Sequence, residues 1–254
     1  MIKINNKKGQ IALWVIAAIA IVAIVVLILI ISRQSLKAGE SISDPKRLIE
    51  QCARDAVNEA LEKMMPQGGF VEPENYKVYR NIKTAYLCEN IGYFQTCINQ
   101  HPFLIQEMEK EIDNYAKPRL DACFADLESE REKRGEEVEI GSMETNATLA
   151  SNRVYYNIQR EVSISKNGEK RSYSEFNAEI ENPAYDLAEV ARDIVNSEAQ
   201  NCYIEYVGYM LLYKRWDITK YTLSDSTKIY TIKDRENNKE MNIALRGCAI
   251  PPGI

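Results

Sequence analysis

The sequence has 254 residues, of which 45% are hydrophobic and 27% charged, and its formal net charge is −5. Lys3, Lys7 and Lys8 precede every acidic residue, so the chain beyond them carries −8, which argues against nucleic acid or anionic lipid as a partner of that part of the chain. We find no phosphate-binding glycine loop, no G-x-S-x-G elbow and no H-E-x-x-H motif. One histidine in the whole chain makes a zinc site improbable. The sequence therefore predicts no cofactor, no metal and no enzymatic activity.

Residues 11–31 are an uninterrupted apolar run without charge, proline or glycine. At about 1.5 Å per residue such a helix reaches roughly 30 Å, the hydrocarbon thickness of a bilayer. A cleavable secretory signal has a shorter apolar region, of about 7–15 residues. We therefore expect a transmembrane helix over 11–32, with the lipid bilayer contacting residues 11–31.

The orientation of this helix is inferred from its flanks. Positive charges are nearly balanced on the two sides, but residues 1–10 hold three lysines and no acid. We expect residues 1–10 to be a cytoplasmic basic tail and the larger C-terminal part to lie outside the cell membrane. Residues 33–45, with Gly39 and Pro45, are interpreted as a linker.

Residues 46–134 predict a helical subdomain. From Leu48 to Met64, apolar residues recur at intervals of three and four residues. This spacing predicts an amphipathic helix that ends before the 66–69 turn. Residues 70–100 predict one or two short strands. A second helix is expected after His101-Pro102, and Pro118 should kink or split it.

Residues 135–254 predict an α+β subdomain with β-hairpins. Strand-like runs at 138–150, 154–164 and 171–181 include an Asn167-Gly168 hairpin turn. One helix should follow Asn182-Pro183 and another should cover about 201–214, before strands near 217–223, 228–233 and 240–246. The fold class predicted is α+β: one N-terminal transmembrane helix, then an extracytoplasmic domain of amphipathic helices and antiparallel β-hairpins.

Six cysteines lie after the apolar run and none within it. An even number on one side of a membrane favours disulfides in an oxidising compartment, although six reduced core cysteines would fit a cytoplasmic domain. Fifteen pairings are possible. The apolar stripes of two helices favour Cys52 with Cys123, and closeness in the sequence favours Cys88 with Cys97, which leaves Cys202 with Cys248.

Other candidate residues carry weaker signals. Asn146-Ala-Thr148 is an N-glycosylation sequon, which fits an exterior location. His101 precedes a proline in a predicted loop, where a surface or capping role is favoured over general-base catalysis. The fifteen tyrosines serve core packing or form an adhesive aromatic surface. We assign no catalytic residue.

The start of the chain, Lys7-Lys8-Gly9-Gln10 before the apolar run, resembles the class III signal of archaeal pilins and archaellins. That resemblance implies cleavage between Gly9 and Gln10 and packing of the apolar helix in a filament core. The chain as a whole resembles a group of uncharacterised single-pass surface proteins of small-genome archaea. The shared features are the KKGQ start, a cysteine-bearing helix ending in QGGF (67–70) and a final YTIKDRENNKEMNIALRG segment (230–247). This second resemblance implies architecture and location only.

Three functions remain open. The first is a membrane-anchored extracytoplasmic protein with a binding or structural role, in contact with other surface proteins or with itself. It is favoured because Gly39 and Pro45 interrupt the helix that a pilin would continue. The second is a pilin-like filament subunit processed after Gly9, and the third is an anchored enzyme.

Overall fold

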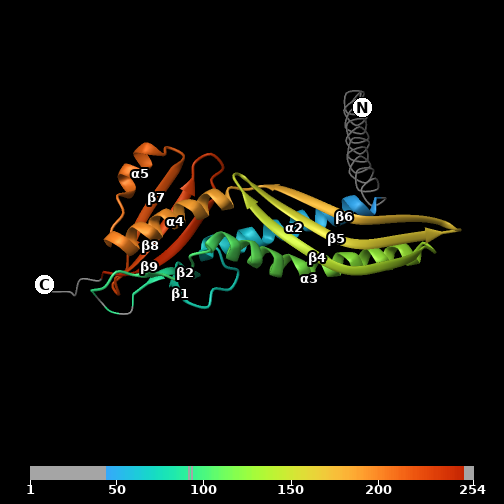
Figure 1. The fold of residues 1–254 in the computed structure, drawn as a ribbon, viewed down its shortest axis with the longest axis horizontal. Coiled ribbons are helices and arrows are strands. Elements are labelled where there is room, and N and C mark those ends of the chain that lie inside the picture. Colours follow the sequence, from blue (N-terminus) through green and yellow to red (C-terminus); the bar gives the residue numbers. More distant parts are fainter. Residues whose placement is uncertain (1–43, 91, 93, 249–254) are drawn as a thin grey trace, which may run out of the picture. The chain divides into compact units, whose positions relative to one another are not determined.

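The computed structural model describes residues 44–90, 92 and 94–248, shown in colour in Figure 1. From residue 49 onwards the described chain forms one compact unit. The expected basic tail, transmembrane helix and most of the linker lie outside the described residues. Within the described ranges, no helix has the length and hydrophobicity that crossing a bilayer requires.

Two long helices form one layer of this unit. Helix α2 spans Pro45–Met64, and the Asp44 carboxylate accepts a hydrogen bond from the Lys46 backbone N–H (3.1 Å) at its start. Helix α3 spans Leu104–Lys133 and contains Pro118. The expected split at Pro118 does not occur. The proline is solvent-exposed, so water can satisfy the carbonyl that it leaves unpaired, and buried Ala116 and Leu120 hold the helix on the core.

A three-stranded antiparallel sheet packs on these helices (Figure 1). Its strands are β4 (Glu137–Ala150), β5 (Arg153–Lys166) and β6 (Glu169–Glu181), in that order. Alternate residues such as Tyr156, Ile158 and Phe176 are buried, and the other face is largely polar and exposed. Asn167 and Gly168 both have positive φ in the β5–β6 turn, as the hairpin prediction requires.

The second sheet has six strands taken from both ends of the described chain. Its strands are β1 (Tyr76–Tyr79), β2 (Ile82–Glu89), β3 (Ile98–Asn99), β7 (Trp216–Thr222), β8 (Thr227–Asp234) and β9 (Glu240–Arg246). The order is β1-β2-β9-β8-β7, and β3 pairs with β2. All pairings are antiparallel except that of β2 with β9, which is parallel.

The parallel pairing changes the domain organisation that the sequence suggests. The strands between residues 76 and 99, expected in a helical subdomain, share one sheet with the last three strands. Segments on both sides of the expected boundary at residue 134 therefore belong to the same sheet. Local sequence patterns do not predict the pairing of β2 with β9, because about 150 residues separate these two strands.

Helices pack on the six-stranded sheet. Helix α4 (Ala184–Asn201) packs on β8 and β9 over Tyr230, Ile232 and Ile243, and α5 (Tyr206–Leu212) lies beside β7 (Figure 1). The short helix η1 (Met65–Gln67) and the turn after it contact β2 and β9. The α+β class with antiparallel sheets is thus confirmed for the described residues.

Candidate functional site

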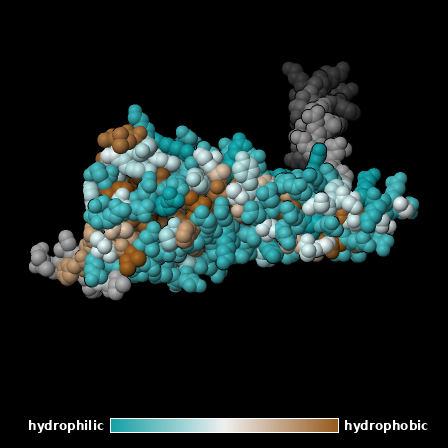
Figure 2. All heavy atoms as spheres, viewed as in Figure 1, coloured by the Kyte–Doolittle hydropathy of each residue, from teal (hydrophilic) through white to brown (hydrophobic). Residues whose placement is uncertain are grey.

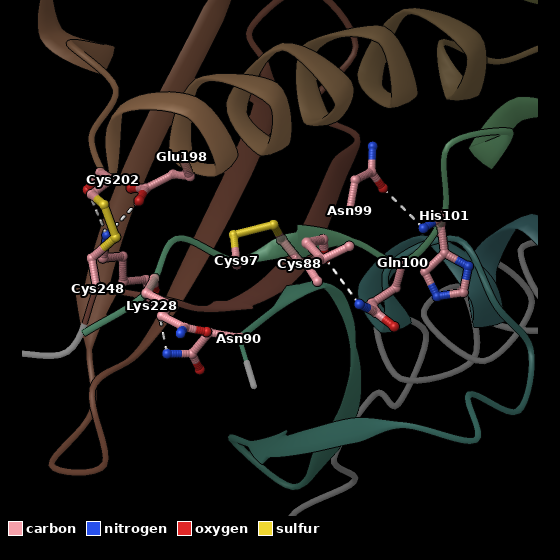
Figure 3. Close-up of a disulfide and its surroundings, with 12 residues drawn as sticks. Cys88, Asn90, Cys97, Asn99, Gln100, His101, Glu198, Cys202, Lys228 and Cys248 are labelled. Carbon is pink, nitrogen blue, oxygen red and sulfur yellow. Dashed lines mark hydrogen bonds and ion pairs between the residues drawn. A yellow bond between two sulfur atoms is a disulfide. The ribbon is translucent and has the colours of Figure 1, made fainter. Parts of the chain in front are cut away.

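All six cysteines are paired in the combination that the sequence favours. The helix bridge, Cys52–Cys123, joins α2 to α3 with Cα atoms 6.7 Å apart. The loop bridge, Cys88–Cys97, closes the segment after β2 (5.3 Å), and the tail bridge, Cys202–Cys248, joins the end of α4 to the residues after β9 (5.7 Å). Figure 3 shows the loop and tail bridges. The prediction of disulfides is confirmed.

The other sites expected from the sequence stand apart from the cysteines. Gly9 and Gln10 lie outside the described residues. Asn146 is exposed on the outer face of β4, where its Nδ2 donates to Thr148 Oγ1 (3.2 Å). An oligosaccharyltransferase could reach this side chain, and glycosylation at Asn146 stays a prediction.

A cleft of about 370 Å³ lies where the 68–75 turn meets β2 and α3. The turn needs glycine at Gly69, because φ is +95° and a Cβ there would come within 2.9 Å of Met108 Cγ. The cleft, called the His101 cleft below, is lined by Phe70, Glu72, Pro73, Glu74, Asn75, Ala85, Tyr86, Gln100, His101 and Glu111.

His101 is held in this cleft by three neighbours. Its Nδ1 lies 2.5 Å from Glu107 Oε2, its ring centroid lies 4.5 Å from that of Phe70, and its backbone N–H donates to Asn99 Oδ1 (2.9 Å). Figure 3 shows the last contact. A carboxylate on Nδ1 fixes the orientation of the imidazole ring. Sequence reasoning did not find the partner Glu107.

Three further carboxylates make the cleft acidic. Glu111 Oε2 accepts the Val71 backbone N–H (2.9 Å), so this side chain also holds the turn in place. Glu72 and Glu74 line the opening beside it. Negative charge next to the Phe70 ring suits a cationic group better than an anionic one. Among the described residues, no three or more His, Cys, Asp or Glu side chains come together as metal ligands.

A buried polar cluster lies beside the tail bridge (Figure 3). Glu198 on α4 is only 3% exposed and accepts hydrogen bonds from Tyr230 Oη and Lys228 Nζ. Lys228 Nζ also donates to the Cys202 carbonyl (2.9 Å) at the end of α4. Burial, and then the bond to Glu198, raise the pKa of the Tyr230 phenol, so it stays a donor at physiological pH.

The Glu198 cluster has a structural explanation. Every group in it has a partner, so it satisfies the C-terminal turn of α4 and joins that helix to β8. Sequence reasoning missed Glu198, although a signal exists: it continues the apolar stripe of α4 four residues after Ile194. A charged residue at such a position needs a buried partner.

Exposed apolar side chains gather around α5. Leu211 and Leu212 are 73% and 80% exposed, and Val207 one turn earlier is 49% exposed. Figure 2 shows hydrophobic atoms at the place that α5 occupies in Figure 1. Two half-exposed tyrosines flank the helix in the sequence, Tyr203 before it and Tyr213 directly after it. The whole set is called the α5 surface below and consists of Tyr203, Val207, Leu211, Leu212 and Tyr213.

The tyrosines of this protein divide between the core and the surface. Tyr156 and Tyr230 are fully buried and pack in the core, whereas Tyr203 and Tyr213 of the α5 surface are about half-exposed to solvent. Both roles that the sequence allowed for tyrosine, core packing and an aromatic surface, therefore occur in this protein.

The chain matches no protein-family model, no curated protein and no solved structure.

Proposed function

We propose that this chain is a membrane-anchored extracytoplasmic protein with a binding or structural role. The observation that carries the proposal is the set of three disulfides in the domain that follows the apolar run. Disulfides persist in oxidising compartments and are rare where glutathione and thioredoxin keep thiols reduced. The apolar length of residues 11–31 supplies the anchor, and the three lysines before it favour an N-terminus inside.

The binding role is proposed for the His101 cleft. Its size suits a small molecule or a side chain of a partner protein, and its aromatic ring and carboxylates suit a positively charged group. We propose no reaction for it, because the cleft is lined by no hydroxyl or thiol nucleophile other than the phenol of Tyr86, which bonds Thr227 Oγ1 (2.8 Å).

The location is tested on intact cells that express the full chain. We expect added protease to remove the domain and leave a short membrane-retained fragment. A membrane-impermeant maleimide should label no cysteine before reduction and six after denaturation and reduction. A domain that stays protected from protease on intact cells, or six thiols that react without reductant, would overturn the proposal.

A filament subunit is the second candidate, supported by Lys7-Lys8-Gly9-Gln10. It requires cleavage between Gly9 and Gln10, so mass spectrometry of the purified protein should give Gln10 as the first residue. A Gly9→Val variant is the matched control, because a larger side chain at that position should block the peptidase. An N-terminus at Met1 or Ile2 in the wild-type protein contradicts this candidate and leaves the anchored protein.

A further inference from the structure

We propose that the His101 cleft binds a guanidinium group, carried by an arginine side chain of a partner protein or by a small diffusible guanidine. This inference rests on the proposed function, since it takes the cleft as the place of the binding role. The cleft holds about 370 Å³, enough for one long side chain or a small ligand. Its free polar atoms, its net charge and its aromatic ring then determine which chemical group fits.

Most of the polar atoms that the cleft leaves without a described partner are hydrogen-bond acceptors. Glu111 holds the Val71 backbone N–H with Oε2 (2.9 Å), which leaves its second carboxylate oxygen available. Glu72 and Glu74 are exposed, and among the described residues neither carboxylate has a donor or a cation as partner. A ligand that satisfies these three side chains has to donate several hydrogen bonds and carry positive charge.

The amide donors that line the cleft are already engaged. Gln100 Nε2 donates to the Ile98 carbonyl (2.9 Å), and Asn75 Nδ2 donates to Glu89 Oε2 (2.8 Å). An anionic ligand, which can only accept hydrogen bonds, would therefore compete with bonds that the protein makes by itself. The hydrogen bonding of the cleft thus favours a donor-rich ligand over an anionic one.

The charge of the cleft points the same way. Among the described residues that line it, none is lysine or arginine. Lys63 and Lys83 line a neighbouring cleft that shares Glu72. Lys63 Nζ lies 3.8 Å from Glu59, and Lys83 Nζ lies 4.8 Å from the Tyr76 ring centroid. Because both lysines contact other residues, the carboxylates of the His101 cleft keep a negative field that attracts a cation.

The aromatic ring favours a flat cation. Phe70 lines the cleft, with its ring centroid 4.5 Å from that of the His101 imidazole. A guanidinium is planar, stacks on aromatic faces, and holds its N–H donors in one plane, where carboxylates can accept them in pairs. An ammonium is compact and more strongly hydrated, and a quaternary ammonium has no donor. The guanidinium is therefore the cation that uses both the ring and the carboxylates.

The turn that carries Phe70 and the two exposed carboxylates is held in place without a ligand. Gln67 Nε2 donates to the Val71 carbonyl (2.8 Å), close to the point where the Val71 N–H meets α3. At the other end, the Tyr86 backbone N–H donates to the Asn75 carbonyl (3.0 Å), which ties the turn to β2. A site that is ordered beforehand loses less conformational freedom when it binds.

The test compares three blocked amino acids as ligands of the full chain in deuterated detergent, by saturation-transfer difference NMR, which detects weak binding. N-acetyl-arginine amide carries the guanidinium, N-acetyl-lysine amide carries an ammonium, and N-acetyl-citrulline amide carries a neutral group of nearly the same shape. We expect the arginine compound to bind about tenfold more tightly than the citrulline compound and about threefold more tightly than the lysine compound. Equal affinity for arginine and citrulline, or for arginine and lysine, overturns the inference.

Variants of the full chain test whether binding occurs in the cleft. Glu72→Gln combined with Glu74→Gln removes two exposed charges, so the fold should be kept and the arginine compound should bind roughly tenfold more weakly. Glu132→Gln combined with Glu161→Gln is the matched control, because both residues are exposed and neither lines the cleft. Unchanged binding in the first variant, or an equal loss in the control, overturns the inference.

A third variant tests the ring. Phe70→Leu should weaken binding of the arginine compound about threefold and bring its affinity closer to that of the lysine compound. The circular dichroism spectrum should match that of the wild type, because leucine keeps an apolar side chain in the turn. An unchanged preference for arginine over lysine in this variant contradicts the role of the ring and overturns the guanidinium assignment.

A further ligand, agmatine, distinguishes the two sources of the group. Agmatine that binds more than about tenfold more tightly than the blocked arginine identifies a small diffusible guanidine. Agmatine within that range of the blocked arginine identifies an arginine side chain of a partner protein. Either result supports the guanidinium.

The same data separate this inference from the proposed function. Arginine and lysine compounds that bind equally, and lose affinity together in the Glu72→Gln, Glu74→Gln variant, keep the cleft as a cation site and refute the guanidinium alone. If none of the compounds binds, the inference and the binding role of the cleft both fail. The location outside the membrane is judged separately, by protease and maleimide on intact cells.

Discussion

Arg215 joins three separate parts of the fold, and its removal should destabilise all of them together. Its Nε and Nη2 donate to Asp234 Oδ2 (3.0 and 2.7 Å) at the end of β8, and its Nη2 also lies 3.4 Å from Asp186 on α4. The same Nη2 donates to Asn152 Oδ1 (2.5 Å) in the β4–β5 turn. One side chain thus links the three-stranded sheet, α4 and the six-stranded sheet.

The cost of removing it follows from the burial of its main partner. The Asp234 side chain is 0% exposed and Arg215 is 22% exposed. Burial opposes ionisation of Asp234, but the bonds from Arg215, the Glu236 backbone N–H and Asn237 outweigh it and lower the pKa of its carboxyl. An Arg215→Met variant leaves a buried carboxylate with two of its donors. Breaking such a pair costs about 3–5 kcal/mol, and we expect the lower end because Arg215 is partly exposed.

Replacing Asp234 should cost less stability than replacing Arg215, because Asp234 is the more deeply buried of the two. Asp234→Asn keeps the shape and leaves Arg215 near Asp186 and solvent, so it should cost about 1 kcal/mol. The double variant should cost clearly less than the sum of the two single variants, since the lone buried charge is then gone.

Urea unfolding of the oxidised protein measures these changes in the free energy of unfolding. The probes are circular dichroism and the emission of Trp216, whose ring centroid lies 4.6 Å from the Arg215 guanidinium carbon. A loss for Arg215→Met below about 0.5 kcal/mol, the usual range of a surface substitution, would refute this account of the cluster. Strictly additive single variants would refute it as well.

Three further predictions concern stability. Replacing both cysteines of the helix bridge by serine should lower the free energy of unfolding by about 4 kcal/mol, against about 2.5 kcal/mol for the loop bridge, because the bridged residues are 71 and 9 positions apart. Gly69→Ala should cost about 2–4 kcal/mol, since it adds a Cβ 2.9 Å from Met108 to the strain of positive φ, whereas Gly135→Ala meets nothing within 4 Å and should cost about 1 kcal/mol. The hydrogen bond from Arg119 lowers the pKa of Glu59 to about 2, so this contact stabilises the fold above about pH 4.5 and is lost as the pH falls toward 2.

Each of these predictions has its own measurement. Urea midpoints of the two bridge variants in the same buffer rank the bridges, and a larger loss for the loop bridge would contradict the loop-length reasoning. Equal losses for the two glycine variants would show that Met108 moves aside. For Glu59, the difference in stability between wild type and Glu59→Gln should shrink between pH 4.5 and 2, and a difference that stays constant over this range would contradict the assignment.

Local patterns were sufficient for most of the secondary structure. Apolar residues at three and four positions predicted α2 and α4, and alternation with Asn167-Gly168 predicted the β5–β6 hairpin. Cysteine pairing also followed from local features, because Cys52 and Cys123 lie on the inner stripes of helices that pack together. Pro118 was the exception, since its effect depends on whether solvent reaches the freed carbonyl.

The candidate site was much less accessible to sequence reasoning. His101 was recognised as the one imidazole of the chain, and its partner Glu107 lies only six positions away, in the first turn of α3. The Phe70 ring and the 68–75 turn reach it only through tertiary contacts, among them that of Gly69 with Met108 of α3. The same holds for Arg215, whose three partners come from three different elements. Contacts between distant segments leave no periodic trace in a single sequence.

The sequence by itself determined the apolar run over residues 11–31, the helices, the hairpins and the favoured cysteine pairs. These depend on local hydrophobicity, spacing and turn chemistry, which act between neighbouring residues. Only the tertiary structure decided that β2 lies parallel to β9, that Glu198 and Asp234 are buried with partners, and that the leucines of α5 face outward. Those facts depend on which apolar surfaces cover one another, and burial is a property of the whole packed chain.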